Sequence, residues 1–109
     1  MKLTYKTKSI EKLCTDEKEM RKRRADIEKR LKLRINALEV NATLGDVVAN
    51  DPLGNWHPLH GNRSGQWAGK VSSNERLIIE PLPNGEVRVE SILSTTEAEV
   101  QGIEDYHKG

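Results

Sequence analysis

The spacing of apolar residues changes once along this chain, and that change limits the fold more than any other feature of the sequence. Residues 25–40 predict the longest helix, because their apolar members recur at intervals of four, four and three and so share one helical face. These members are Ile27, Leu31, Ile35 and Leu38. After residue 65 the pattern becomes the alternation that is typical of half-buried strands.

Shorter elements are expected on the N-terminal side of this change. Residues 3–7 have β-branched and aromatic character and predict a short strand. Ser9 can cap a first helix with its hydroxyl, and Thr15 or Asp16 can cap a second one, since acidic residues follow in its first turn. Another short helix is expected at residues 43–48, which open with the spacing of a capping box.

The second half of the chain predicts a meander of strands. Residues 66–71 and 76–80 alternate, and the Asn-Gly pair within residues 83–85 is favoured in β-hairpin turns. Residues 87–92 are expected to return as a strand, and residues 100–105 as an edge strand that delivers the end of the chain. The sequence therefore predicts an α+β fold, with an N-terminal strand and helices on one face of a mostly antiparallel, twisted sheet. The other face is left for a ligand.

Length and composition predict a single domain over residues 1–109. With 35% apolar and 32% charged residues, the chain has the composition of an ordinary soluble globular protein. No apolar run approaches the ~20 residues that span a bilayer, so no membrane partner is expected. Cys14 stands alone, which excludes a disulfide framework and a cysteine-rich metal site. We expect a cytoplasmic protein without a cofactor or metal.

The charge is distributed unevenly between the two halves of the chain. Residues 1–40 contain 13 Lys and Arg against 7 Asp and Glu, a net charge of +6, whereas residues 41–109 have a net charge of −5. Such an imbalance indicates an acidic partner for the first half. The alternative is that the basic run at residues 21–24 is only a solvated helix face.

Residues 56–76 gather side chains suited to gripping a phosphate backbone, stacking on bases and moving protons. His57 and His60 flank a proline in a loop, and imidazole titrates nearest to neutral pH. Two histidines at this spacing in a loop support proton transfer better than they support a metal site. Arg63 lies between two glycines, which allow the backbone to approach a phosphate closely.

Arg76 begins a strand that is otherwise suited to the core. A buried arginine needs a partner, and its planar guanidinium can donate two parallel hydrogen bonds to a phosphate. An exposed arginine at a strand end is the alternative. Tyr106 and His107 add an aromatic acid or base near the C-terminus, and nearby cations such as Arg63 and Arg76 would lower the pKa of the tyrosine.

The two tryptophans have different expected roles. Trp67 is assigned to the core, whereas Trp56 is either a core residue or a surface on which a base stacks. Trp56 and Lys70 join Arg63 as the candidate substrate contacts.

Three stretches of the chain match the motifs of one family. They read His-Pro-Leu-His-Gly-Asn-Arg-Ser-Gly-Gln-Trp at residues 57–67, Glu-Arg-Leu-Ile-Ile at residues 75–79 and Glu-Asp-Tyr-His at residues 104–107. They resemble the RelE/ParE superfamily of bacterial toxins, and most closely its HigB branch. The family pattern there is approximately His-Pro-Leu-Lys-Gly-Asp-Arg-x-Gly-x-Trp, then Trp-Arg-Ile/Leu, then Glu-Asp-Tyr-His. The order of elements also matches over nearly the whole chain.

The resemblance implies the toxin of a type II toxin–antitoxin module that acts as a ribosome-dependent mRNA endonuclease. It would cut mRNA in the A site of the 70S ribosome by metal-independent attack of the 2′-hydroxyl, and so inhibit translation. A HigA-like helix-turn-helix antitoxin would neutralise it, with DNA contacted only through that complex. The resemblance implies these catalytic residues: His57, His60, Arg76, Tyr106 and His107.

The resemblance also implies roles for these residues, which we treat as a hypothesis. His57 or Tyr106 acts as the base and His107 as the acid, while Arg76 and His60 stabilise charge on the phosphate. His60 stands where HigB usually has lysine, so it is charged only part of the time near neutral pH. Two alternatives stay open: a ParE-like gyrase inhibitor, which lacks the histidine pair and terminal Tyr-His, and an inactive RNA-binding domain.

Overall fold

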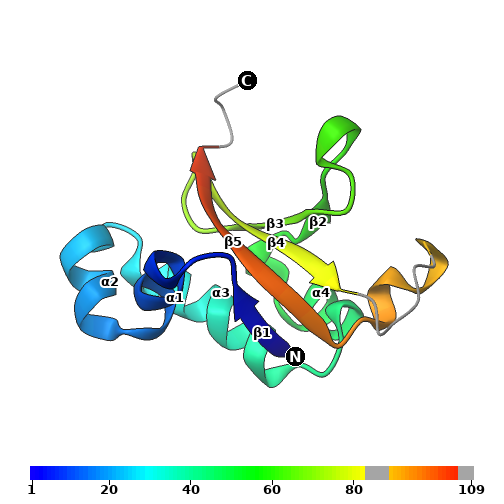
Figure 1. The fold of residues 1–109 in the computed structure, drawn as a ribbon, viewed down its shortest axis with the longest axis horizontal. Coiled ribbons are helices and arrows are strands. Elements are labelled where there is room, and N and C mark those ends of the chain that lie inside the picture. The colour runs from blue at the N-terminus through cyan, green and yellow to red at the C-terminus, as the bar shows by residue number, and fades with distance from the viewer. Residues whose placement is uncertain (83–88, 106–109) are drawn as a thin grey trace.

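The molecule is built on a five-stranded sheet with helices on one face (Figure 1). A computed structural model describes residues 1–82 and 89–105. The strands of this part are β1 (Lys2–Tyr5), β2 (His57–Pro58), β3 (Trp67–Lys70), β4 (Glu75–Leu82) and β5 (Glu97–Asp105). Their order in the sheet is β1-β5-β4-β3-β2, with β1 and β5 parallel and the other neighbours antiparallel. The expected α+β fold is confirmed.

The helices follow β1 in the chain and cover the core side of the sheet (Figure 1). The α-helices of the described part are α1 (Lys8–Thr15), α2 (Glu17–Arg24), α3 (Glu28–Val40) and α4 (Leu44–Asn50). Short 3₁₀-helices lie at η1 (Pro52–Gly54), η2 (Gly61–Arg63) and η3 (Val89–Ser94). None of the described helices has the length and apolar character that crossing a membrane requires.

Local capping explains where most helices begin. Asp16 caps α2 and Thr43 caps α4, each accepting hydrogen bonds from backbone N–H groups of the first turn, as expected from the sequence. The prediction that Ser9 caps the first helix is wrong. Thr7 takes that role, because its hydroxyl accepts a hydrogen bond from the Ile10 amide at 3.1 Å.

One prediction about the strands is also wrong, and another needs only its start moved. Within the predicted strand at residues 87–92, the described part belongs to the 3₁₀-helix η3. β4 is already paired on both edges, by β3 and β5, so this segment has no open edge to join and packs against α4 instead. The predicted edge strand at residues 100–105 is present as the second half of β5, which begins at Glu97. β1 pairs only with Glu97–Val100, so beyond Val100 this strand pairs with β4 alone.

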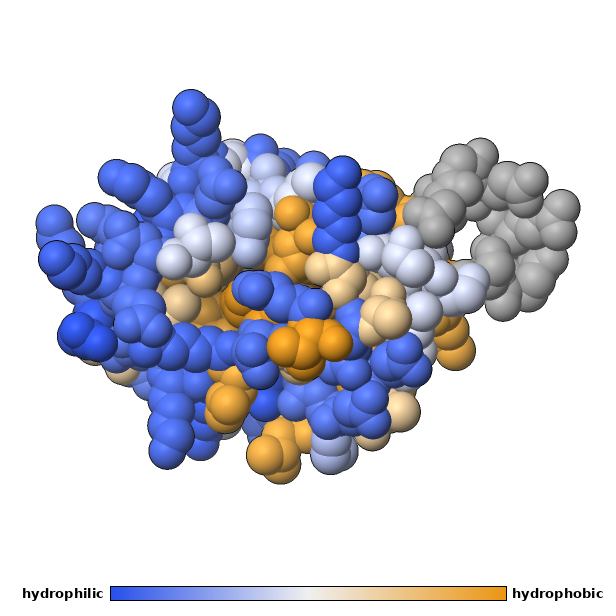
Figure 2. All heavy atoms as spheres, turned by 90° about the horizontal axis from the view of Figure 1, so that it is seen from below, coloured by the Kyte–Doolittle hydropathy of each residue, from blue (hydrophilic) through white to orange (hydrophobic). Residues whose placement is uncertain are grey.

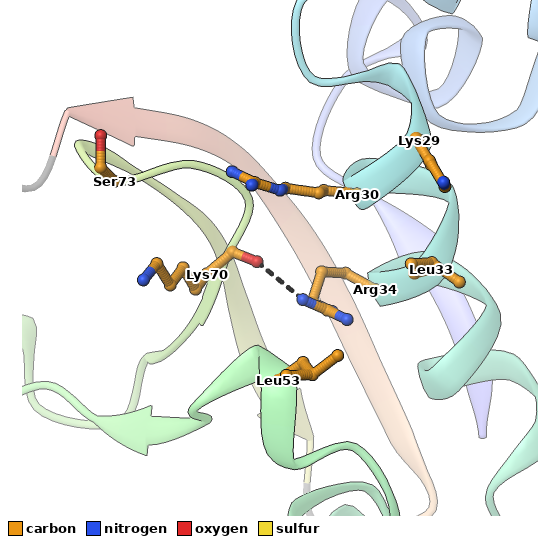
Figure 3. A pocket seen from close by; sticks show the side chains of 7 residues that line it. All are labelled: Lys29, Arg30, Leu33, Arg34, Leu53, Lys70 and Ser73. Atoms are coloured by element: carbon orange, nitrogen blue, oxygen red, sulfur yellow. Dashed lines mark hydrogen bonds between the residues drawn. The ribbon is translucent and has the colours of Figure 1, made fainter.

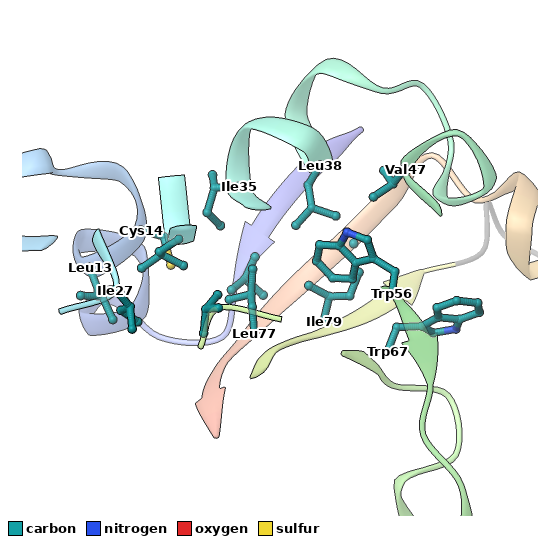
Figure 4. Close-up of a cluster of buried hydrophobic side chains, with 14 of the residues drawn as sticks. Leu13, Cys14, Ile27, Ile35, Leu38, Val47, Trp56, Trp67, Leu77 and Ile79 are labelled. Atoms are coloured by element: carbon teal, nitrogen blue, oxygen red, sulfur yellow. The ribbon is translucent and has the colours of Figure 1, made fainter. Parts of the chain in front are cut away.

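One face of β4 supplies the centre of the core. Leu77 and Ile79 are fully buried against the helices, together with Leu38 of α3 (Figure 4). Leu31 of α3 belongs to the same cluster and is also fully buried. Each fully buried side chain of this kind contributes roughly 1.5–3 kcal/mol. Because side chains alternate along a strand, the residues between them point to the opposite, helix-free face of the sheet.

Candidate functional site

A hollow of about 210 Å³ lies on the helix-free face of the sheet. It draws on the loop between β2 and β3, on the start of β4 and on the end of β5. Its lining residues are Leu59, His60, Arg63, Arg76, Ile78, Glu104 and Asp105. Three residues singled out from the sequence, His60, Arg63 and Arg76, therefore meet at one place.

A β-bulge brings the end of β5 into this hollow. Ile78 lies opposite Gly102 but Ile79 lies opposite Val100, so Gln101 has no residue opposite it. With regular alternation from buried Val100, Glu104 would point to the helices. The extra residue reverses the alternation and places Glu104 opposite Arg76 on the helix-free face. The bulge also explains Gly102, whose φ of 140° favours glycine.

Arg76 is a buried cation at the start of β4. Only 9% of its surface is exposed, and its Nη1 donates to the carbonyl oxygens of Ser72 and Glu75 at 3.0 Å each. The β3–β4 turn therefore fixes this guanidinium beside the hollow. A positive charge that is held in place before substrate arrives can stabilise developing negative charge without reorganising.

Arg63 is held in a different way, by side chains. Its Nε donates to Gln66 Oε1 at 2.6 Å, and its two terminal nitrogens donate to the Glu104 carboxylate at 3.1 and 2.5 Å. The loop that carries it turns at Gly61 and Gly65, whose φ values of 68° and 99° favour glycine. A phosphate that binds Arg63 must compete with the Glu104 carboxylate.

His57 lies on the same face of the sheet as the hollow but does not line it. In the strand register His57 is opposite Ala68, which is opposite Ile78, and paired residues share a face. Two strand spacings separate His57 from Ile78, roughly 10 Å. Its Nδ1 lies 2.8 Å from the Asn55 carbonyl. A carbonyl can only accept, so Nδ1 carries the hydrogen, and in the neutral ring Nε2 is the acceptor.

Lys70 and Trp56 occupy two different environments. Lys70 is exposed and lies opposite Arg76 in the strand register, on the same face, without lining the hollow. Trp56 is 6% exposed and its Nε1 donates to Asp51 Oδ2 at 2.9 Å. Its ring lies so close to Gly69 that a β-carbon there would approach it to 2.5 Å. Trp56 is therefore a core residue, and its ring is not exposed for a base to stack on.

Tyr106 and His107 lie outside the described residues. The last described residue, Asp105, lines the hollow. In the described ranges, no group of three or more His, Cys, Asp and Glu side chains is arranged to hold a metal ion.

A buried arginine that the sequence reading missed supports this part of the structure. Arg34 of α3 is 4% exposed, lies 3.0 Å from Asp51 and donates to the Lys70 carbonyl at 3.0 Å. Asp51 in turn accepts the Trp56 indole hydrogen bond. The signal was present, because Arg34 follows Leu31 by three positions on the buried face of the helix.

Comparison with known proteins identifies the fold. No family model matches the chain, and no curated protein matches it. Among solved structures, the chain is similar to the YoeB/ParE toxin from Agrobacterium tumefaciens, with 21% sequence identity and a TM-score of 0.54. The similarity covers 98% of this chain and 100% of that toxin. The chain therefore has the α+β fold of that toxin.

Proposed function

We propose that this chain is the toxin of a type II toxin–antitoxin module and cleaves mRNA in the A site of the 70S ribosome. The observation that carries the proposal is the meeting of His60, Arg63 and Arg76 in one hollow on the helix-free face of the sheet. Similarity to the fold of a YoeB/ParE toxin supports it, as do the HigB-like motifs of the sequence.

The proposed reaction is a metal-independent transfer within RNA. The 2′-oxygen bonds to the adjacent phosphorus as the bond from phosphorus to the 5′-oxygen breaks, which leaves a cyclic phosphate and a 5′-hydroxyl. Arg76 and protonated His60 stabilise the charge on the phosphate, and Arg63 binds a phosphate of the substrate. These groups lie on a face that an RNA strand can cross.

Proton transfer in this reaction needs a base and an acid. His57 suits the base, because the Asn55 carbonyl fixes the hydrogen on Nδ1 and makes Nε2 the ring acceptor. Tyr106 is the alternative base. His107 is the proposed acid, which donates a proton to the leaving 5′-oxygen.

The proposal includes a partner and a location. A HigA-like antitoxin with a helix-turn-helix neutralises the toxin, and the complex contacts DNA only through the antitoxin. The module acts in the cytoplasm, where ribosomes and mRNA are its targets.

The decisive experiment replaces Arg76 by Ala and maps mRNA cleavage on translating ribosomes by primer extension. We expect a loss of about 100-fold, because a fixed charge beside the phosphate disappears. Arg21→Ala is the matched control, since that arginine is exposed on α2. If Arg76→Ala does not fold, as judged by circular dichroism, His60→Ala replaces it, because His60 is exposed. Undiminished cleavage by a folded variant would refute the proposal.

The same cultures separate the nuclease from its two alternatives. Cut transcripts with intact DNA supercoiling support the nuclease. Loss of supercoiling with intact transcripts would instead identify a ParE-like gyrase inhibitor. If expression changes neither transcripts nor supercoiling and the purified chain still binds single-stranded RNA, the chain is an inactive RNA-binding domain.

A further inference from the structure

A second, larger hollow lies between α3, η1 and the β3–β4 turn. Its volume is about 540 Å³, and it shares no lining residue with the candidate site. We name it the α3 groove and define it by Lys29, Arg30, Leu33, Arg34, Leu53 and Lys70. In Figure 3, Arg30 extends from α3 toward the β3–β4 turn, and Leu53 lies on the other side of the contact between Arg34 and Lys70.

The charged residues that line the α3 groove are all cations. Arg34 is neutralised by its salt bridge with Asp51. Lys29 and Arg30 form no ion pair with any carboxylate in the described ranges of the chain. Lys70 meets Arg34 through its carbonyl, and its ammonium points away from α3 (Figure 3). The groove therefore presents positive charge that is available to an acidic partner.

Two exposed apolar side chains line the same groove as these cations. Leu53 is 75% exposed and Leu33 is 48% exposed. Leu33 also lines a neighbouring hollow of about 310 Å³ beside Arg21 and Lys32, so it stands between two depressions of the same helix. Figure 2 shows the helical side of the molecule, where separate apolar side chains lie among hydrophilic ones. A phosphate backbone would gain little from covering leucines, whereas a protein would bury them.

We propose that the α3 groove is the docking site for an acidic amphipathic helix of a protein partner. Leucines one helical turn apart on that helix would cover Leu33 and Leu53, and glutamates beside them would face Lys29 and Arg30. A helix in a groove is a recurring mode of recognition that combines such apolar anchors with flanking charge. This site is independent of the proposed nuclease, because the two hollows share no lining residue.

The test uses the full chain and a defined probe. The probe is a fluorescent peptide of about 18 residues, long enough for a stable amphipathic helix, with Leu along one face and Glu on both flanks. We expect it to shift NMR amide signals at residues 29–34 and 52–54. In fluorescence anisotropy, Arg30→Glu or Leu33→Ser should weaken binding about tenfold, since each removes an anchor of the interface.

Matched controls make the result specific. Val40→Ser removes an apolar residue that is also on α3 and is 69% exposed but lies outside the groove, so it should bind the peptide like the unchanged chain. A peptide with Lys in place of Glu should not bind. The proposal would be overturned if both groove variants bound the peptide as tightly as the unchanged chain does. It would also be overturned if the unchanged chain did not bind the peptide at concentrations up to about 1 mM.

A nucleic acid is the competing occupant. A single-stranded RNA of 12 to about 15 nucleotides, comparable to known single-strand sites, serves as the second probe. If Arg30→Glu weakens RNA binding while the peptide fails to bind, the groove is a nucleic-acid surface and the protein proposal is wrong. Ribosomal mRNA cleavage by the same variants reports on the nuclease separately and is expected to be unchanged.

Discussion

At the scale of single residues, the candidate site holds two arginines in contrasting ways. Arg76 is buried and donates to the backbone carbonyl oxygens of Ser72 and Glu75, which fix its guanidinium in place. Arg63 is partly exposed and paired with the Glu104 carboxylate, which occupies the positions that phosphate oxygens would take. Arg76 therefore suits the stabilisation of a reacting phosphate, and Arg63 suits an exchangeable contact with the RNA backbone.

This contrast predicts that Glu104→Gln strengthens RNA binding. The substitution removes a carboxylate that competes for Arg63, and an exposed pair of this kind contributes about 1 kcal/mol, so affinity should rise about fivefold at low salt. Fluorescence anisotropy with a labelled single-stranded RNA measures the change. Glu11→Gln, an exposed site on α1, is the control. Weaker binding by the Glu104 variant would mean that the carboxylate supports RNA instead.

The residue types of the hollow could be predicted from the sequence, but not all of their surroundings. Arg76 stood out because it begins a strand that is otherwise suited to the core. His60 stood out as one of two histidines that flank a proline, and Arg63 because it lies between two glycines. Trp56 could not be assigned, since nothing local shows that Asp51 accepts its indole hydrogen bond. The pairing of Arg63 with Glu104 spans 41 positions and leaves no local signal.

At the scale of elements, local chemistry was predictable and pairing between strands was not. The caps at Asp16 and Thr43 lie within a few residues of the amides they bind, so the sequence contains the whole motif. η3 differs, because its departure from a strand depends on β3 and β5 having already occupied both edges of β4. The bulge at Gln101 likewise exists only relative to β4.

One ion pair joins several elements and predicts a large effect on stability. Arg34 of α3 binds Asp51, which holds Trp56, and also binds the carbonyl at the end of β3. Arg34→Met should lower the free energy of unfolding by about 3–5 kcal/mol, because it leaves a mostly buried carboxylate without its cation. Urea unfolding measures this. Adding Asp51→Asn should restore part of the loss.

A neighbouring arginine provides the control for this experiment. Arg30 lies on the same helix but is exposed, so Arg30→Met should change the free energy of unfolding by no more than about 0.5 kcal/mol. A loss in Arg34→Met as small as that of Arg30→Met would show that the ion pair does not connect these elements energetically.

At the scale of the whole molecule, the residues that stabilise the fold and those proposed to carry the chemistry lie on opposite faces of the sheet. The core lies between the helices and one face of the sheet, and the hollow lies on the other face. The excess positive charge of residues 1–40 belongs to the helical layer, where the α3 groove is. The excess cations of residues 1–40 therefore fall into two groups. Some form ion pairs within the chain, as Arg24 does with Glu75, and others are available to a partner.

Two ionisable side chains on the core side of the sheet, Cys14 and Tyr5, predict how the stability of the molecule changes at alkaline pH. Burial raises the pKa of the Cys14 thiol from 9.0 to about 11, and burial also raises that of the Tyr5 hydroxyl from 10.0 to about 12, with smaller contributions from Cys14, Glu39 and Glu11. Both groups stay neutral in the folded chain at pH values where the unfolded chain ionises. Their contribution to stability is therefore complete below pH 9.0 and declines as the pH rises toward about 12.

The melting temperature, followed by circular dichroism from about pH 8 to pH 11.5, tests this linkage. The unchanged chain should lose Tm steeply over the upper part of that range. The double variant Tyr5→Phe with Cys14→Ala should start lower, since it loses packing, but decline less steeply, since neither new side chain ionises. Lysines titrate in both proteins, so their effect on Tm cancels when the two declines are compared. Parallel declines would show that Cys14 and the partly buried Tyr5 do not govern alkaline unfolding, and that the core gains nothing from keeping them neutral.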